Sequence, residues 1–201
     1  MRFYMDYNAS APIYDEVIDF ILEAYKYIGN PSSIHASGRQ SRALIEDARE
    51  SIAKIINTKP QNIIFTSGAT EANSMIPKFI YGHEIIISSI EHPSILSQFE
   101  NANMVSVNSN GLILLDHLEE ILKSLSNKKI FVSIMAVNNE TGVIQPIEKI
   151  SKICKKYGAI YHVDAVQAIG RIPISMESMN LDLITLSSHK IGGPKGIGCL
   201  A

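Results

Sequence analysis

The sequence is short of the residues that build disulfide frameworks and membrane spans. It has two cysteines in 201 residues, Cys154 and Cys199, and they form no C-x-x-C pair. Isolated thiols of this kind argue against a disulfide scaffold and favour a reducing cytoplasm. The longest apolar runs, such as E-I-I-I-S-S-I at 84–90, are far shorter than the roughly 20 residues that a transmembrane helix needs. The first residues also lack the apolar core of a signal peptide, so we expect a cytoplasmic protein that does not enter a membrane.

A block of basic residues is missing as well. The net charge is −2 and the estimated pI is 6.3, so nothing in the charge pattern indicates a nucleic-acid partner. Of the residues, 46% are hydrophobic and 19% are charged, which is typical of a globular protein with a sizeable core. We find no linker, repeat or low-complexity tract.

Two hydrophobic periodicities alternate along the chain. Residues 17–25 and 42–56 show helical spacing, and further helices are expected over 93–100, 115–125 and 146–158. Short runs rich in Ile and Val predict strands over 62–67, 84–89, 103–108, 129–137, 159–164 and 181–187. This alternation predicts an α/β fold, a three-layer sandwich in which helices cover both faces of a mainly parallel sheet. Pro77 should shorten or kink the helix that follows Gly68.

Polar residues gather where the predicted strands end, and ligands of parallel sheets bind at that edge. After the strand 62–67 comes S-G-A-T-E-A-N, in which Gly68 permits a sharp turn before a helix. Thr70 and the free N–H groups of that helix could cradle an anion, although Thr70 could equally be a plain helix cap.

Two further strand ends carry groups that can contact a flat ligand. Pro93 keeps His92 out of a helix, so its imidazole could stack on a ligand, exchange a proton or simply lie in a surface turn. Asp164 ends the strand 159–164, and Gln167 follows three residues later. A carboxylate after an apolar run needs a cation, such as a protonated pyridine nitrogen. His162 shares the face of Asp164, which also suits a metal, but the sequence offers no convincing third ligand.

The segment S-S-H-K-I-G-G-P-K-G at 187–196 places one lysine directly after a strand. Lys190 can form a Schiff base, and the glycines that follow let the chain bend away. An anion cradle, an imidazole, a strand-end carboxylate and a lysine together meet the four needs of pyridoxal phosphate (PLP). They hold its phosphate, flank its ring, keep its nitrogen protonated and bond its aldehyde.

These motifs resemble the cysteine desulfurases of the NifS/IscS type, within the class V aminotransferases. The similar segments span nearly the whole chain in the family's order. They are Y-M-D-Y-N-A-S-A-P at 4–12, N-P-S-S-I-H-A-S-G-R at 30–39, T-S-G-A-T-E-A-N at 66–73, E-H-P-S at 91–94, A-V-N-N-E-T-G-V-I-Q-P-I at 136–147, Y-H-V-D-A-V-Q-A-I-G-R at 161–171 and S-S-H-K-I-G-G-P-K-G-I-G at 187–198.

The resemblance implies the large domain of a fold type I PLP enzyme over residues 1–201, truncated before the family's small C-terminal domain. It implies that Lys190 bonds the cofactor and acts as the base, and that His92 stacks on the ring. The other cofactor contacts that it implies are Asp164 at the ring nitrogen, Gln167 at the ring hydroxyl, Asn139 in preference to Asn138, and a phosphate cradle of Ala69, Thr70, Ser187, Ser188 and His189.

The implied reaction takes sulfur from L-cysteine to an enzyme thiol and releases alanine, for iron–sulfur cluster or thio-cofactor synthesis. The thiol and the substrate-binding arginine of the family lie in the small domain, and neither Cys154 nor Cys199 matches the thiol's motif. We therefore expect a homodimer or a complementing C-terminal chain, and a sulfur acceptor or scaffold partner. The alternatives are a PLP-binding remnant or interaction protein without activity, and another class V activity such as a selenocysteine lyase or β-lyase.

Overall fold

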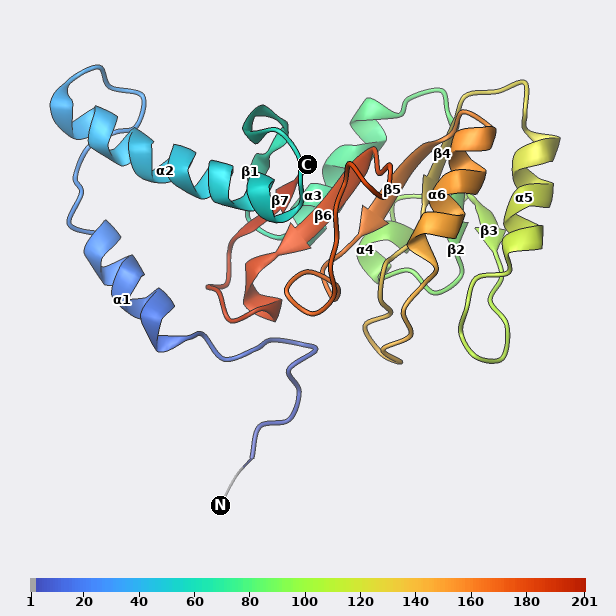
Figure 1. Cartoon of the computed structure of the whole chain (residues 1–201), viewed down its shortest axis with the longest axis horizontal. Helices are drawn as coiled ribbons and strands as arrows, with labels where there is room; N and C mark the ends of the chain where they lie inside the picture. The colour runs from blue at the N-terminus through green and yellow to red at the C-terminus, as the bar shows by residue number, and fades with distance from the viewer. Residues whose placement is uncertain (1–2) are drawn as a thin grey trace.

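A seven-stranded sheet forms the centre of the computed structural model, which describes residues 3–201 (Figure 1). Its strands lie in the order β1-β7-β6-β5-β4-β2-β3, and β7 alone runs antiparallel to its neighbours. All remaining neighbour pairs are parallel, which confirms the mainly parallel α/β sheet expected from the sequence. The strands are β1 (Ile64–Thr66), β2 (Glu84–Ser88), β3 (Asn103–Val105), β4 (Ile130–Ser133), β5 (Ile160–Asp164), β6 (Leu183–Ser187) and β7 (Gly198–Leu200).

Helices cover both faces of this sheet. One buried cluster includes Leu118, Leu122, Ile150 and Cys154, from α5 and α6. The second cluster includes residues of α3 and α4 on the opposite face. The helices are α1 (Asp15–Ala24), α2 (Ala36–Ile55), α3 (Ala69–Phe79), α4 (Pro93–Leu96), α5 (Leu115–Ser124) and α6 (Ile147–Lys156), with short 3-10 turns η1 (Pro60–Asn62) and η2 (Ser188–Lys190).

The sequence located the elements but misplaced several ends. The predicted strand 129–137 ends at Ser133, and the predicted helix 93–100 is one turn long. The helix predicted over 42–56 begins earlier, because the His35 imidazole caps α2 by accepting a hydrogen bond from the Gly38 N–H (3.2 Å). Pro77 lies within α3, which ends two residues later at Phe79. Strand β7 was not delimited by the sequence patterns.

The N-terminal part of the chain differs from the rest in burial. Helix α1 lies apart from the sheet in Figure 1 and contributes no buried residue. Two of its apolar side chains, Phe20 and Leu22, are more than 60% exposed. Farther upstream the chain crosses the loop after β6, where the Ala11 N–H donates to the His189 carbonyl (2.8 Å).

None of the helices within residues 3–201 combines the length and the apolar character that a membrane crossing requires.

Candidate active site

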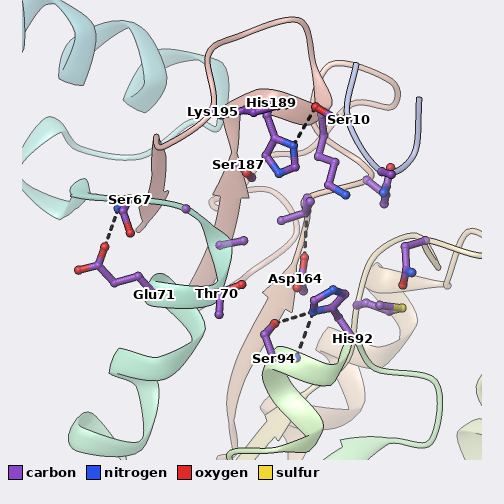
Figure 2. Close-up of a pocket in the computed structure, with 18 of the residues that line it drawn as sticks. Ser10, Ser67, Thr70, Glu71, His92, Ser94, Asp164, Ser187, His189 and Lys195 are labelled. Carbon is purple, nitrogen blue, oxygen red and sulfur yellow. Dashed lines mark hydrogen bonds between the residues drawn. The ribbon is translucent and has the colours of Figure 1, made fainter. Parts of the chain in front are cut away.

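One cavity of about 610 Å³ opens at the carboxyl ends of the sheet strands (Figure 2). Its walls come from the segments that follow β1, β2, β4, β5 and β6, and from residues 9–10 of the N-terminal segment. Of the residues predicted for the site, Ser188 alone does not line the cavity. Those that line it are Ala69, Thr70, His92, Asn139, Asp164, Gln167, Ser187, His189 and Lys190.

An anion cradle lies on one side of the cavity. Helix α3 begins at Ala69, and its N-cap Gly68 provides no side-chain cap for the free N–H groups. The Ser187 hydroxyl is buried and has no hydrogen-bond partner within residues 3–201, although Ser187 lines the same cavity. An uncapped helix start beside an unsatisfied buried hydroxyl is a site built to receive an anion.

The approach of β7 to the α3 start needs a glycine. A Cβ atom at Gly198 would lie 2.7 Å from the backbone of Gly68 and 2.8 Å from the Leu186 carbonyl oxygen. No larger residue fits there without moving the backbone. The glycine therefore allows β7 to lie between β1 and β6, next to the turn that starts α3.

Ser188 and His189 have different positions in the loop after β6. The Ser188 hydroxyl contacts the carbonyl oxygens of Pro194 and Ile197 and can donate its one hydrogen to either, so it is used within the loop and does not line the cavity. His189 lines the cavity, and its Nδ1 lies 3.4 Å from the Ser10 hydroxyl. Burial, and then the positive charges of Lys190 and Lys195, lower the pKa of the His189 imidazole.

Lys190 reaches across the cavity to the N-terminal segment. Its Nζ donates to the Asn8 carbonyl oxygen at 2.6 Å, and the Gln167 side-chain amide donates to the same oxygen at 2.9 Å. Burial lowers the pKa of the Lys190 amine; the charge of Asp6 acts in the opposite direction, and the charge of Arg171 lowers the pKa further. A lowered pKa raises the neutral fraction of the amine, which a nucleophile or a general base requires.

Arg171 holds the segments that carry Gln167 and Lys190. Its guanidinium donates to the Gln167 side-chain oxygen, and to the Lys190 backbone carbonyl at 3.0 Å. The sequence patterns did not single out Arg171. No spacing in the sequence could have found it, because residues 166–171 form turns and not a helix.

Asp164 is a buried carboxyl at the end of β5. Its Oδ1 accepts from the Val166 N–H (3.0 Å) and its Oδ2 accepts from the Asn73 side-chain amide (3.2 Å). Burial raises the pKa of Asp164 above its usual value, while these hydrogen bonds and the charges of His92 and Lys190 act in the opposite direction. The carboxyl thus lines the cavity without a salt-bridge partner within residues 3–201 and is suited to a cationic ligand atom.

His92 is held by its neighbour in α4. The His92 Nδ1 accepts a hydrogen bond from the Ser94 N–H (3.1 Å) and lies 2.8 Å from the Ser94 hydroxyl. Figure 2 shows the imidazole across the cavity from the Ser187 and His189 side. The alternative of a free surface turn does not fit this environment, since the ring is half-buried and fixed by two contacts.

The structure also separates the two neighbouring asparagines. Asn138 is buried, and its side-chain oxygen accepts from the N–H groups of Glu140 and Thr141, so it shapes the turn after β4. Asn139 lines the cavity. The preference for Asn139 over Asn138 as a ligand contact therefore stays a prediction with a geometric basis.

His162 and the cysteines lie outside the cavity. The two nitrogens of the buried His162 ring contact the hydroxyls of Ser133 (2.8 Å) and Thr185 (3.0 Å), so both are used within the core. Within residues 3–201 no group of three or more His, Cys, Asp or Glu side chains could hold a metal ion. Both thiols are buried, and burial raises the pKa of Cys154 to about 12 and of Cys199 to about 11.

Two buried polar residues next to the site were not singled out by the sequence patterns. Glu91 accepts hydrogen bonds from the Ser88 hydroxyl and from the Met135 N–H (2.8 Å). Burial raises its pKa to about 8. Asn73 is fully buried in α3 and donates to both Ser94 and Asp164. Both belong to the motifs at 66–73 and 91–94, so their polarity was visible but their burial was not.

The residues present fit PLP. The cavity has the size of a small-molecule site, since such pockets usually measure about 300–1,000 Å³. The uncapped α3 start and the unsatisfied Ser187 hydroxyl suit a phosphate. Asp164 suits a protonated pyridine nitrogen, and Lys190 suits an aldehyde.

Comparison with known proteins identifies the family of the chain. The family model for aminotransferase class-V matches residues 3–201. The chain is 45% identical over 210 residues to a mitochondrial cysteine desulfurase of Candida albicans, covering 97% of this chain and 42% of that protein. A crystal structure of a NifS-like protein from Rickettsia africae superposes with a TM-score of 0.94 at 44% identity, covering 100% of this chain and 57% of the other.

A third relative was solved with an amino acid bound. The structure titled "SspA in complex with cysteine" superposes with a TM-score of 0.90 at 33% identity, covering 98% of this chain and 60% of the other. The chain spans about half the length of the curated relatives that it matches. On the match over residues 3–201, the chain belongs to the class-V aminotransferase family.

Proposed function

We propose that residues 3–201 form the PLP-binding large domain of a cysteine desulfurase that acts on L-cysteine. The observation that carries the proposal is the convergence of Lys190, Asp164, His92 and Ser187 on one cavity. The similarity to cysteine desulfurases and to a NifS-like structure supports the choice of substrate. In this proposal the protein works in a reducing compartment, where thiols such as Cys154 and Cys199 stay reduced.

The proposed roles follow from the environment of each side chain. When bound, PLP would supply an electron sink next to the substrate α-carbon. The Ser187 hydroxyl and the α3 start would hold the phosphate, and Asp164 would keep a proton on the pyridine nitrogen. Lys190, whose pKa is lowered by burial, would accept the α-proton of the substrate as a general base. His92 would cover one face of the ring.

The sulfur acceptor must be a thiol other than Cys154 or Cys199. A nucleophilic thiol needs access to the substrate and a large thiolate fraction. Both cysteines are buried outside the cavity, and their raised pKa values keep them protonated at neutral pH. We propose that the acceptor thiol belongs to a further chain segment, a second copy or a separate protein.

The position of the thiols also favours a second candidate. A lyase that eliminates sulfur or selenium from its amino-acid substrate needs no enzyme thiol at all. The two candidates differ in product, because a desulfurase leaves a persulfide on a protein thiol whereas a lyase releases free sulfide or selenide. Assaying both products with L-cysteine and L-selenocysteine distinguishes them.

The proposal is tested first by cofactor attachment. Purified protein is incubated with PLP, its visible absorption is recorded, and borohydride followed by mass spectrometry locates any adduct. We expect the adduct on Lys190 and none in Lys190→Ala. Lys195→Ala is the matched control, since Lys195 lines the same cavity and should leave the adduct on Lys190. Folded protein without an adduct at Lys190, or an adduct at another lysine, would refute the proposal.

A second experiment tests whether activity requires a C-terminal domain in addition to this chain. The chain loaded with PLP is combined with a C-terminal domain from a cysteine desulfurase, and alanine is measured. We expect alanine release that depends on L-cysteine and on the added domain. If no alanine forms although PLP is bound, the result favours the alternative that the chain is a PLP-binding remnant without activity.

A further inference from the structure

A continuous chain of hydrogen bonds links His92 to Asp164 beneath the cavity. The Asn73 Nδ2 donates one hydrogen to the Ser94 hydroxyl (2.9 Å) and the other to the Asp164 carboxylate (3.2 Å). The Ser94 hydroxyl in turn contacts the His92 Nδ1 (2.8 Å). Figure 2 shows the last part of this chain, with dashed lines from the His92 ring to Ser94 of α4. Asn73 and Ser94 therefore connect two groups that act on opposite parts of the proposed ligand.

The direction of each hydrogen bond follows from the donors. The Ser94 N–H can only donate, so the His92 Nδ1 that it meets at 3.1 Å must present a lone pair. The Ser94 hydroxyl accepts from Asn73, which leaves its own hydrogen for the same Nδ1. A neutral imidazole that accepts at Nδ1 carries its hydrogen on Nε2. Within residues 3–201, Nε2 has no hydrogen-bond partner, and His92 lines the cavity.

The orientation of the Asn73 amide is fixed by charge. If its nitrogen and oxygen were exchanged, the oxygen would face the Asp164 carboxylate, which also only accepts. In the present orientation both N–H groups are used, while the buried Asn73 oxygen has no partner. Asn73 is buried in α3 together with Ala72 and Ile76. An apolar side chain at this position would leave no buried oxygen without a hydrogen-bond partner. A polar group retained at such a cost is typical of a functional site.

We propose that Asn73 and Ser94 are positioning residues that commit His92 to the tautomer with its hydrogen on Nε2 and hold the Asp164 carboxylate toward the cavity. The consequence is a fixed N–H donor on one side of the ligand and a fixed carboxylate at the strand end. The benefit of this arrangement for a bound ligand rests on the proposed function. The His92 tautomer and the Asp164 pKa can both be measured in the protein without cofactor.

The test measures by NMR which ring nitrogen of His92 carries the hydrogen. Protein labelled with ¹⁵N at histidine is prepared without cofactor, and the ring nitrogen shifts of His92 are recorded at alkaline pH, where imidazoles are neutral. His92→Gln assigns the signal among the six histidines of the sequence. We expect the Nε2–H form to dominate in the wild type. Ser94→Ala removes one donor to Nδ1 and should lower the ratio of the two tautomers about tenfold, the equivalent of one hydrogen bond.

A second variant distinguishes the two branches of the network, which lead from Asn73 through Ser94 to His92 and from Asn73 to Asp164. Asn73→Leu keeps the size of the side chain and removes both donors, so it should shift the His92 tautomer ratio and also raise the pKa of the Asp164 carboxyl. That pKa is read by ¹³C NMR titration, with Glu91, His92 and Lys190 as the other titratable groups nearby. Ser94→Ala should move the tautomer ratio and leave Asp164 almost unchanged.

The control is Ser151→Ala, which removes another buried hydroxyl, bonded to the Asn180 carbonyl (3.1 Å) far from the cavity. A purely structural role for Ser94 predicts that both serine variants lose stability and that neither changes the His92 ratio. An unchanged ratio in folded Ser94→Ala overturns the proposal, and so does an unmoved Asp164 in folded Asn73→Leu. If Asn73→Leu does not fold, Asn73→Ala replaces it, and Ser94→Ala still decides the His92 branch.

The outcomes also distinguish this inference from the proposed function. The tautomer ratio and the Asp164 titration need no PLP, so they can succeed when no adduct forms at Lys190. Conversely, normal cofactor attachment with an unchanged tautomer ratio would keep the proposed function and reject the positioning role.

Discussion

Replacing Glu91 by Gln should stabilise the protein at alkaline pH. The Glu91 carboxyl is 4% exposed, and its Oε1 accepts from the Ser88 hydroxyl and the Met135 N–H. Its Oε2 is buried without a partner within residues 3–201. Burial is the main reason that its pKa rises from 4.5 to about 8, and the nearby Asp164 charge adds to the effect. The folded protein therefore holds this proton at neutral pH, whereas the unfolded chain releases it.

The sign and size of the effect follow from proton linkage. Between pH 4.5 and about 8 the folded state binds more protons than the unfolded state, so stability falls as the pH rises. One proton per molecule changes the free energy of unfolding by at most about 1.4 kcal/mol per pH unit. Because Glu91 is only partly titrated at both ends of the range, the change between about pH 5 and about pH 8 is about 3.5 kcal/mol. Gln keeps the oxygen that accepts both hydrogen bonds and does not titrate. The variant should therefore be close to the wild type in stability near pH 5 and exceed it by about 3.5 kcal/mol near pH 8.

Urea unfolding of the protein without cofactor, followed at several pH values, measures this difference. Glu84→Gln is the control, because Glu84 is a partly exposed residue of β2 paired with Lys128, and pairs near the surface contribute about 0–1 kcal/mol. Parallel pH profiles for Glu91→Gln and the wild type would refute the reasoning, as would a variant that is less stable than the wild type near pH 8. Either result would mean that Glu91 is ionised in the folded protein.

Three further predictions use the same stability and binding assays. Ser187→Ala should leave the free energy of unfolding without cofactor unchanged or higher, since its buried hydroxyl has no partner, and should weaken PLP binding about tenfold in a spectroscopic titration. A loss of stability with unchanged binding would contradict it. Burial lowers the pKa of His162 to about 3, so stability should fall by up to about 1.4 kcal/mol per pH unit as the pH drops below 6.5, and His162→Gln should flatten that slope. An equal slope in both proteins would exclude this cause. Cys154→Ser and Cys199→Ser should each cost about 1–3 kcal/mol of stability and leave alanine and persulfide formation unchanged in the complemented assay. Loss of persulfide with retained PLP would identify the altered residue as the acceptor.

The order of elements was predictable because hydrophobic periodicity is a local property. Each strand rich in Ile and Val appears in the sheet, and the apolar stripe through Ile150 and Cys154 is buried as the spacing predicts. Element ends were less predictable. Residues 134–137 look like a strand, and the Ala136 N–H still donates to the Asp164 carbonyl of β5 (2.9 Å), but β4 itself ends at Ser133. The apolar face of α1 likewise suggests burial, yet none of its residues is buried within this part of the chain.

The site residues that could be predicted are those with reactive or charged side chains at the ends of predicted strands. Asp164 ends a predicted strand, Lys190 and His92 each follow one, and the carboxyl ends of parallel strands meet at one edge. Ser188 shows the limit of this reasoning. Its hydroxyl sits one residue from Ser187, but the 3-10 turn directs it to the carbonyls of Pro194 and Ile197. Neighbours in sequence point in different directions, and only the backbone path decides which of them lines the cavity.

The sequence by itself determined the α/β class, the edge of the sheet that carries the site and the residue types that suit PLP. These follow from periodicity and from the chemistry of side chains at strand ends, which need no knowledge of distant contacts. Only the tertiary structure decided which polar groups are buried together. The pairing of Asn73 with Ser94 and Asp164, and the hydrogen bond from Lys190 to the Asn8 carbonyl, join residues up to 182 positions apart. Protonation states such as that of Glu91 depend on this burial, because the free energy of a charge is set by its surroundings and not by its place in the chain.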